Sequence, residues 1–445
     1  MPKMQERLSL KVLIAYSGIT VPMAAMGMPI AVYLPRFYSE GLGLSLITVG
    51  TIFTIARVWD VITDPIMGIM IDKFDTRWGR RKHWIAISMP VLVLSVWMVF
   101  MPDPDAVTGA YLLFWLIFLY LGYTMLAISH QSWGAELSQS YDDRSRLFGW
   151  REIFVIGGMT VVLAIPAAME LSGHNDQESK VASMGWFCLV FFPLLVVPTL
   201  TMVPDSRQKI SAPIPWSEAI AVLVTNKLMW RLLVTDLGAG IAFGVSGALY
   251  IFIATTFFKL PEHASLALLF FFLSSFCAMP IWMRLAYKIG KDRTLTFSLI
   301  YMILINVAMI PLAEEYSVIV LWSYTILFGA GFGAPPTLVR SMMADVVDED
   351  ELNYGQSRPA LFFALLTTTN KLGAALAVGA SFTVLEVVIG FVPGGDNSQD
   401  VLDGLLLTYT LGAIIGLIAA WLPLIRYPLT KAVHLGIRQQ LESRP

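Results

Sequence analysis

Three ionisable residues lie close together inside one apolar segment, in the run Arg57-Val-Trp-Asp60-Val-Ile-Thr63-Asp64. On a helix, positions 57, 60 and 64 fall on one face, so the guanidinium and the two carboxylates are stacked. An ionised carboxylate in the middle of a membrane costs at least about 2.5 kcal/mol, so the pair requires a neutralising partner. A structural ion pair with Arg57 accounts for only one aspartate. The pair therefore predicts an acceptor site for one monovalent cation, Na⁺ or H⁺, with the hydroxyls of Thr63 and Thr124 completing its oxygen shell.

Other polar side chains inside apolar segments are candidates for contact with a solute. The fourth segment carries His130, Gln131 and Trp133 in its polar second half. His130 is either a proton relay or ligand donor, or a residue that hydrogen-bonds between helices. Arg151 opens the fifth segment, where it either reaches into a cavity or snorkels to the interface. Lys371 lies well inside the eleventh segment and must face protein or water, which favours a functional role.

Charged loops next to the segments predict contacts that hold one conformation closed. The loop 68–82 mixes acidic residues, glycine and arginine, and the stretches 142–146 and 345–351 are similarly charged. Their charges would pair with the cytoplasmic ends of neighbouring helices, although a basic loop can also serve membrane topology alone. The residues assigned to this gating role are Arg57, Asp72, Arg80, Arg81, Glu136, Arg144, Asp345 and Arg358.

The composition requires that these residues be carried by membrane helices. Of the 445 residues 56% are apolar and 14% are charged, and the mean hydropathy is +0.68. A soluble globule is about 45–50% apolar and about 25% charged, so a water-soluble enzyme is excluded. Twelve apolar segments are long enough to span a bilayer. They cover residues 12–36, 43–70, 84–102, 108–137, 150–171, 184–203, 229–257, 263–288, 293–313, 317–344, 360–391 and 403–425.

The distribution of lysine and arginine predicts the topology. The first segment is too long for the apolar core of a signal peptide, so it is expected to be a retained span. With the N-terminus in the cytoplasm, the outer loops receive only Arg36, Lys180 and Lys259, whereas most other basic residues fall in inner loops. This asymmetry agrees with the positive-inside rule. Both termini are therefore predicted to be cytoplasmic.

The chain divides into two six-span halves that carry a weak repeat. The predicted parts are an N-terminal half with the cation site at 1–203, a cytoplasmic linker at 204–228, and a C-terminal half with a short tail at 229–445. The loop that starts at Gly79 corresponds to the one that starts at Gly290, and Ala135-Glu136 corresponds to Ala344-Asp345 at a nearly equal offset. Such repeats are typical of secondary transporters that work by alternating access, with the binding site near the midplane.

Several functional classes lack their motifs in this sequence. There is no phosphate-binding loop for ATP hydrolysis and no paired Cys/His spacing for a metal centre, and Cys188 and Cys277 both lie inside apolar runs. No arginine-rich voltage sensor or repeated filter loop indicates a channel. With a net charge of −2, the chain has no bulk attraction to nucleic acid. We expect a transporter that is not an enzyme and has no cofactor apart from its coupling ion.

These motifs resemble those of the glycoside–pentoside–hexuronide:cation symporters of the major facilitator superfamily, the family of melibiose permease. The most specific run is 56–68, which is close to the family's second-helix signature. Support comes from the stretches 133–136 and 143–146, and from 344–348 followed by 355–358 and Lys371. The resemblance covers nearly the whole chain and implies an all-α membrane protein with the twelve-helix major facilitator fold.

The resemblance also assigns the cation and cavity residues. In melibiose permease two second-helix aspartates, an asparagine between them and a fourth-helix threonine bind the coupling cation. The matching positions here are Asp60, Asp64, Thr63 and Thr124, and the change from asparagine to threonine leaves Na⁺ and H⁺ open. Arg151 and Lys371 match charged cavity residues of that permease.

The resemblance departs at the residues that recognise the solute. The aspartates with which the permease holds its sugar correspond to Ala24 and Ala127, and residues 22–28 form a soft apolar wall. The predicted function is cation-coupled symport of a sugar derivative or hexuronide-like organic anion by a monomer in the cell inner membrane. A lipid-like solute is the alternative, because the family has lysophospholipid-carrying relatives; a non-transporting sensor or scaffold is the alternative of another class. The substrate-binding set is Arg151, Lys371, His130, Gln131, Ala24, Ala127 and Trp133.

Overall fold

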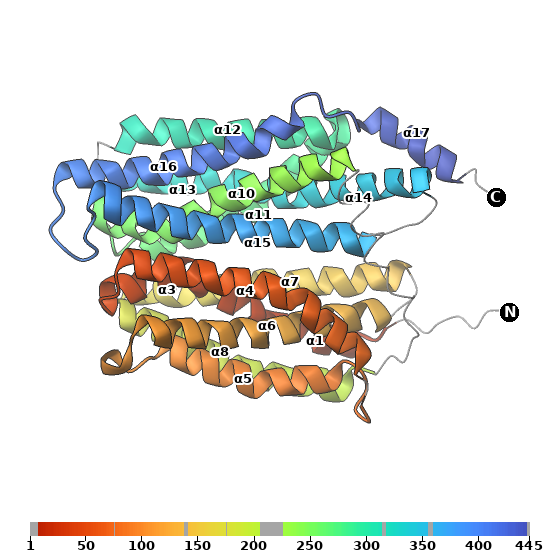
Figure 1. Cartoon of the computed structure of the whole chain (residues 1–445), viewed down its shortest axis with the longest axis horizontal. Coiled ribbons are helices and arrows are strands. Elements are labelled where there is room, and N and C mark those ends of the chain that lie inside the picture. Colours follow the sequence, from red (N-terminus) through yellow and green to blue (C-terminus); the bar gives the residue numbers. More distant parts are fainter. Residues whose placement is uncertain are drawn as a thin grey trace. The chain divides into compact units, whose positions relative to one another are not determined.

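The computed structural model describes residues 8–74, 76–137, 141–174, 176–204, 226–313, 317–354 and 359–442, and these parts consist of helices and their connections (Figure 1). Twelve helical stretches of the described residues are long and apolar enough to cross a membrane, which confirms the twelve predicted spans. They are Leu10–Gly41, Leu46–Ile71, Lys82–Phe100, Gly109–Gly134, Ile153–Leu171, Gln177–Met202, Lys227–Phe257, Ala264–Ile289, Lys291–Leu312, Val318–Asn353, Phe362–Ile389 and Gln399–Leu424.

The N-terminal unit, Met1–Ser211, contains the first six spans, and the first of them is the irregular one. Its prolines interrupt the backbone hydrogen bonds of the helix: one π-helical turn begins at Pro29, and a second begins two residues after Pro35. The other five spans are continuous helices. The elements in order are α1 (Leu10–Gly18), α2 (Thr20–Met28), η1 (Pro29–Tyr33), α3 (Leu34–Arg36), η2 (Phe37–Gly41), α4 (Leu46–Lys73), α5 (Lys82–Phe100), η3 (Pro104–Ala106), α6 (Gly109–Leu137), α7 (Tyr141–Leu171) and α8 (Gln177–Met202).

Small residues let the helices of this unit approach closely. A Cβ atom added at Gly158 of α7 would lie 2.4 Å from the carbonyl oxygen of Val21 in α2. One added at Gly122 of α6 would lie 3.0 Å from the side chain of Leu92 in α5. Lipid is as apolar as a leucine side chain, so helix association in a membrane depends on such close packing. The helices α4 and α6 also pack on each other, which places the second and fourth spans side by side.

The C-terminal unit, Ala212–Pro445, contains the other six spans. The tenth span is broken at Gly333, just before Pro335 and Pro336, and the seventh and eleventh spans end in π-helical turns. The elements in order are α10 (Lys227–Phe252), η4 (Ile253–Phe257), α11 (Ala264–Ile289), α12 (Lys291–Leu312), α13 (Val318–Phe332), α14 (Ala334–Tyr354), α15 (Pro359–Thr383), η6 (Val384–Ile389), α16 (Gln399–Trp421), η7 (Leu422–Leu424) and α17 (Lys431–Glu442).

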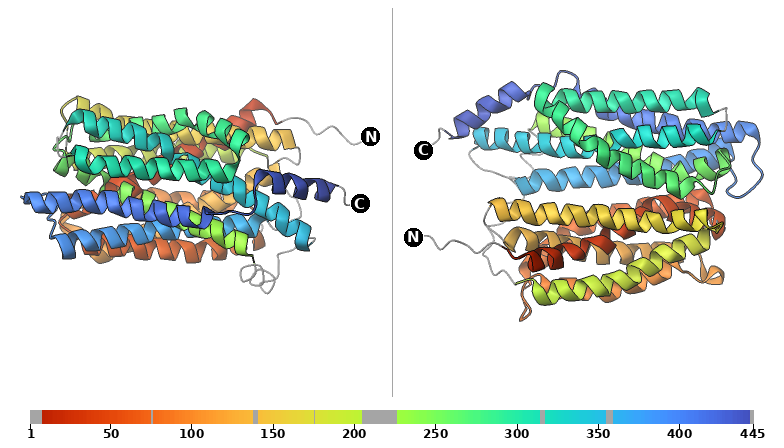
Figure 2. Two further views of the ribbon diagram at one scale, coloured as in Figure 1. Left: turned by 90° about the horizontal axis from the view of Figure 1, so that it is seen from above. Right: turned by 180° about the vertical axis from the view of Figure 1, so that it is seen from behind.

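Helix α10 is held between α15 and α16 by glycines. A Cβ atom at Gly240 would lie 2.7 Å from the backbone oxygen of Asn370 in α15, and one at Gly416 of α16 would lie 2.5 Å from the backbone nitrogen of Ala242. Each glycine therefore permits direct contact between two helix backbones. The short helix α17 follows the last span and lies beside the end of α14 (Figure 2).

The two units repeat one local feature that the sequence predicted. Gly79 lies before α5, the third span of the N-terminal unit, and Gly290 lies before α12, the third span of the C-terminal unit. The φ angles of the two glycines are positive, 92° and 101°. Glycine adopts this backbone conformation without the steric cost that other residues meet. The division between units, after Ser211, falls within the expected linker 204–228, of which residues 205–225 lie outside the described part.

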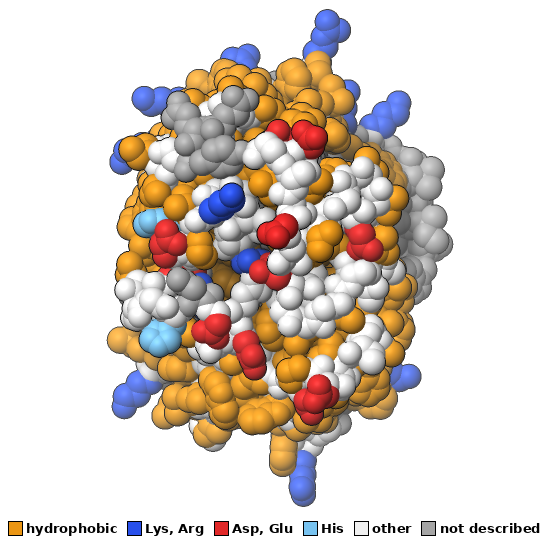
Figure 3. All heavy atoms as spheres, turned by 90° about the vertical axis from the view of Figure 1, so that its left-hand side faces the viewer, with side chains coloured by type: hydrophobic (Ala, Val, Ile, Leu, Met, Phe, Trp, Pro, Cys, Tyr) orange, Lys and Arg blue, Asp and Glu red, His pale blue; other side chains and the backbone are white. Residues whose placement is uncertain are grey.

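One end of the helices carries polar and acidic side chains among apolar ones. Figure 3 views the end at which α15 connects to α16, and acidic side chains are exposed there among uncharged polar groups and hydrophobic side chains. Exposed apolar residues of the described spans, such as Leu304 and Ile415, lie on the helix flanks. This arrangement suits helices whose flanks contact lipid and whose ends contact water.

Candidate cation and solute site

Three oxygen atoms from two helices meet in the N-terminal unit. The hydroxyl oxygen of Thr124 in α6 lies 2.9 Å from Oδ1 of Asp60 and 2.8 Å from Oδ1 of Asp64, both in α4. Asp60 and Thr124 are each only 1% exposed. Asp60 and Asp64 share a face because they are four residues apart on a helix, and packing of α4 on α6 brings Thr124 between them. The structure thus brings together three of the four residues expected at the cation site.

The geometry of this group favours a bound positive charge. A hydroxyl group has one proton to donate, whereas an ionised carboxylate can only accept. Thr124 can therefore donate to only one carboxylate at a time, and a positive species near the oxygens would stabilise its short distance to the second. A proton on one carboxyl group supplies it, and so does a metal cation coordinated by all three oxygens. The arrangement fits the binding of H⁺ or of Na⁺.

Arg57 offsets part of the negative charge. Its Nη1 lies 3.4 Å from Oδ2 of Asp60, and its guanidinium carbon lies 4.5 Å from the centre of the Tyr120 ring. The ring face attracts the cation and holds it beside the aspartate. One guanidinium and two carboxylates leave one negative charge when both carboxyl groups are ionised. Thr63 differs from the expectation, because its hydroxyl donates to the backbone oxygen of Asp60 rather than to a carboxylate.

An apolar cluster packs on both helices one to two turns beyond Asp64 along α4. Met67 and Ile71 of α4 contact Met125 of α6, and all three are buried. The partly buried residues Trp84, Leu121 and Ile128 cover this cluster. Since an apolar environment offers an ion no hydrogen bonds, the cluster disfavours passage of a cation in that direction.

His130 connects the first and fourth spans. Its Nε2 lies 2.8 Å from the backbone oxygen of Tyr16, and the Tyr16 hydroxyl donates to the backbone oxygen of His130 at 2.8 Å. The two rings stack at 4.0 Å. Gly134, one turn further on, leaves room for the tyrosine, because a Cβ atom there would lie 2.0 Å from the Tyr16 hydroxyl oxygen. Nδ1 of His130 is buried and has no hydrogen-bond partner among the described residues, and contact of this residue with solute stays a prediction.

The remaining solute residues of this unit lie in different environments. Trp133 is fully buried, and its indole nitrogen donates to the backbone oxygen of Pro204 at 3.1 Å, which gives it a packing role. Ala24 and Ala127 are half-buried, and Gln131 is exposed. Arg151 is half-buried in α7, and its backbone oxygen accepts a hydrogen bond from Thr20 of α2. Solute contact by these residues stays a prediction.

The C-terminal unit holds a buried carboxylate that the sequence analysis did not single out. Asp236 of α10 is 5% exposed, and Oδ2 accepts a hydrogen bond from the Thr369 hydroxyl of α15 at 3.4 Å. Asn370 donates to the same carboxyl group, and Arg340 of α14 interacts favourably with its charge. Lys371, half-buried, is the next residue on α15. The signal in the sequence is a lone aspartate in an apolar run.

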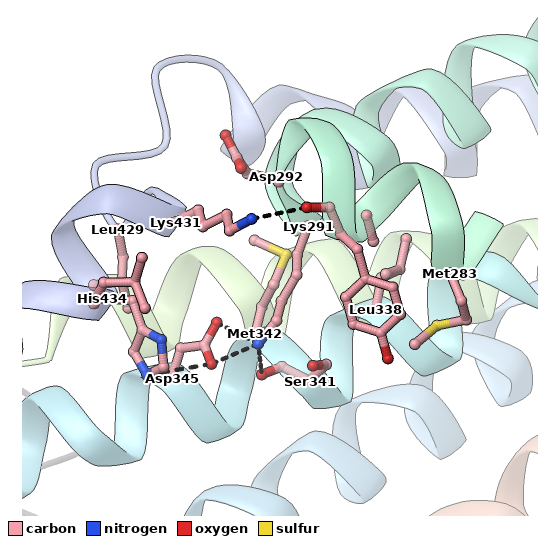
Figure 4. Close-up of a pocket in the computed structure, with 14 residues that line it drawn as sticks. Met283, Lys291, Asp292, Leu338, Ser341, Met342, Asp345, Leu429, Lys431 and His434 are labelled. Atoms are coloured by element: carbon pink, nitrogen blue, oxygen red, sulfur yellow. Dashed lines mark hydrogen bonds and ion pairs between the residues drawn. The ribbon is translucent and has the colours of Figure 1, made fainter. Parts of the chain in front are cut away.

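Asp345, one of the expected gating residues, lies beside a pocket of about 360 Å³ at the end of the C-terminal unit (Figure 4). Nζ of Lys291 lies 2.6 and 2.7 Å from its two carboxylate oxygens. His434 of α17 lies 3.5 Å from Asp345 and 2.9 Å from Asp348. Nζ of Lys431 donates to the backbone oxygen of Tyr287 at 2.8 Å. These contacts dock α17 on α14 and on the junction of α11 and α12.

The other residues expected to take part in gating lie in different environments, and their gating role stays a prediction. Arg81 is 2% exposed, and Arg80 is half-buried, both at the start of α5. Arg57 contacts Asp60 within one helix, so it belongs to the cation site in this conformation. The side chains of Asp72, Glu136 and Arg144, and the whole of Arg358, lie outside the described part of the structure.

Comparisons with known proteins define the class. Residues 15–431 match the family model described as MFS/sugar transport protein, so the chain belongs to this family of the major facilitator superfamily. It is 26% identical to the isoprimeverose transporter of Lactiplantibacillus pentosus, over 90% of this chain and 85% of the relative. It is 23% identical to the sodium-dependent lysophosphatidylcholine symporter 1 of Mus musculus, over 99% of this chain and 90% of that relative.

The fold is also found in a solved transporter structure. A mutant of the nucleoside transporter NupG matches with a TM-score of 0.70 and 14% sequence identity, over 93% of this chain and 99% of that one. The chain is therefore a multi-pass membrane transporter with the major facilitator fold. Its relatives are transporters and symporters rather than enzymes, as the sequence predicted.

Proposed function

We propose that the protein is a symporter that moves an organic solute by alternating access, coupled to one Na⁺ or H⁺ bound at Asp60, Asp64 and Thr124. The observation that carries the proposal is the approach of one hydroxyl to two carboxylates, at 2.9 and 2.8 Å, inside a membrane span. Two carboxylates beside one arginine are costly in lipid unless a cation occupies the site. A sensor or scaffold on the same fold would gain nothing from keeping this pair.

We propose that the solute is a sugar derivative or a hexuronide-like organic anion. The name of the isoprimeverose transporter supports a carbohydrate. Ala24 and Ala127 stand where melibiose permease has sugar-binding aspartates, and the basic residues Arg151 and Lys371 favour an acidic group on the solute.

A lipid-like solute is the second candidate. Its support is the name of the mouse lysophosphatidylcholine symporter and the apolar wall of the first span, where Met23 and Met26 lie. Flexible methionine side chains adapt to acyl chains of different shape.

We place the protein in a bacterial-type inner membrane, because bacterial symporters are among its relatives. We also propose that it acts as a monomer.

The test is solute accumulation in proteoliposomes under an imposed Na⁺ or H⁺ gradient. The panel contains a uronide, its neutral parent sugar and a lysophospholipid. We expect one cation gradient to drive uphill uptake of an acidic sugar derivative, and Asp64→Asn to abolish accumulation while downhill exchange remains. Asp105→Asn is the matched control, since it removes a carboxylate from an exposed loop between spans. Accumulation by Asp64→Asn equal to that of the unmodified protein would refute the coupling site.

A further inference from the structure

A second pocket of the C-terminal unit, of about 380 Å³, lies where α12 begins and α16 ends. Arg293 and Phe297 from the first two turns of α12 line one side of it. Trp421 at the end of α16 and Arg426 in the following turn line the other side. None of these residues belongs to the cation site or to the expected solute set, so the transport proposal leaves this pocket without a role.

The pocket has a positive charge that the described residues do not neutralise. Its charged lining residues are Arg293, Arg426 and Asp292, which gives two positive charges against one negative. Within the described parts of the chain, neither guanidinium makes a hydrogen bond or an ion pair, although both are exposed. The amino-terminal turn of α12 adds its partial positive charge. Burial raises the pKa of Tyr427, which also lines the pocket, so its ring adds no negative charge.

The backbone at Arg426 is held in an unusual conformation. Its φ of 52° lies in the left-handed region, which residues other than glycine seldom adopt. Nη1 of Arg231 in α10 lies 3.2 Å from the backbone oxygen of Arg426 and 3.4 Å from that of Ile425, and so fixes this turn. A strained backbone of this kind persists only where the surrounding structure holds it in place. Arg426 lines the pocket from this turn.

The surface beyond the pocket is apolar. Phe297 is 53% exposed, and Leu304, two turns further along α12, is 61% exposed. Ile415 of α16 and Leu422 at the start of η7 are likewise exposed, and they form a corresponding stripe that ends near Trp421. Because α12 and α16 are membrane spans that pack on each other, these flanks contact acyl chains. Tryptophan at the end of a span is typical of the headgroup region.

We propose that this pocket binds the phosphate of an anionic phospholipid of the surrounding membrane, with Arg293 and Arg426 on the headgroup and the α12–α16 flanks on the acyl chains. An arginine fork matches phosphate oxygens by two parallel hydrogen bonds. Basic pockets between spans on the cytoplasmic side are suited to such headgroups, and the positive-inside rule places the start of α12 on that side. The ligand is a lipid rather than free phosphate because charged and apolar surfaces adjoin.

The test measures lipid retained by the purified, delipidated full chain, by native mass spectrometry during titration. Phosphatidylglycerol is expected to bind more tightly than phosphatidylcholine. The double variant Arg293→Gln/Arg426→Gln should weaken phosphatidylglycerol binding about 25-fold, since each basic residue at an anionic surface contributes about fivefold. The double variant Arg293→Lys/Arg426→Lys keeps both charges but lacks the guanidinium fork, so its affinity for phosphatidylglycerol should be intermediate. This second variant keeps the test valid if the glutamine variant does not fold.

Two controls separate the proposal from its alternatives. Arg284→Gln removes an exposed arginine near the end of α11 that precedes α12, outside the pocket. This variant should bind phosphatidylglycerol as the unmodified protein does. Soluble glycerol 3-phosphate should bind far more weakly than the lipid. Equal binding of glycerol 3-phosphate, equal loss in Arg284→Gln, or full binding by the double glutamine variant would each overturn the proposal. The readout is independent of transport, so it can fail while the proposed function holds.

Discussion

Removing the Thr124 hydroxyl tests the oxygen site with the smallest change of shape. Thr124→Val keeps the branched side chain that packs between α4 and α6, but deletes the oxygen at 2.9 and 2.8 Å from the two carboxylates. A hydrogen bond to a charged group contributes about 1.5–3 kcal/mol. At about 1.4 kcal/mol per tenfold change, the cation concentration for half-maximal uptake should rise about tenfold to a hundredfold.

The assay is initial solute uptake by proteoliposomes as a function of Na⁺ concentration and of pH. Thr124→Ser retains the hydroxyl and is the matched control, with a shift expected to be well below that of valine. The maximal rate at saturating cation should change less than the half-maximal concentration, because the variant keeps both carboxylates. An unchanged cation dependence in Thr124→Val, or equal impairment of the serine and valine variants, would contradict the role given to this oxygen.

Three further predictions follow from the topology, the packing and the solute site. In a variant free of native cysteines, a cysteine at Asp105 should react with an impermeant thiol reagent in intact cells and one at Arg77 should not; the reverse pattern would invert the topology. Gly134→Ala should destabilise the unit by about 1–3 kcal/mol, as overpacking does, with lower thermal stability in detergent that is partly restored when Tyr16 is also shortened; unchanged stability would contradict the 2.0 Å approach. Lys371→Ala should weaken binding of an acidic solute by about 2–3 kcal/mol, the scale of a charge-assisted hydrogen bond. Calorimetry should show a far smaller effect on binding of the neutral parent sugar; equal losses for the two solutes would contradict a contact between Lys371 and the acidic group.

The sequence predicts the membrane spans and the shared helix face of Asp60 and Asp64 well, for physical reasons. Apolar length alone identifies a span, since lipid requires about 20 apolar residues, and all twelve predicted spans are present. The i, i+4 spacing of Asp60 and Asp64 fixes their common face as soon as the segment is helical. Thr124 is placed between them only by tertiary packing, which the spacing within α4 does not show. The sequence could not show that Thr63 would hydrogen-bond its own helix, because the rotamer depends on local backbone geometry.

The solute residues were harder to predict, because span boundaries do not reveal which way a side chain faces. Trp133 lies in the polar half of α6, yet it is fully buried against Pro204. His130 makes reciprocal contacts with Tyr16 that no spacing rule predicts. Asp236 could have been found by the argument used for the α4 aspartates, since it is an ionisable residue in an apolar span. Its contact with Thr369 depends on the close approach of α10 and α15.

The central claim is that Asp60, Asp64 and Thr124 hold the cation that moves with the solute. The most direct measurement is cation flux triggered by solute in proteoliposomes that have no imposed gradient, with the accepted solute added outside and internal Na⁺ and pH followed together. We expect that one of the two cations enters in fixed ratio to the solute, and that Asp60→Asn and Asp64→Asn move solute downhill with no accompanying cation. Solute-dependent cation entry at the unmodified ratio in either asparagine variant would contradict it.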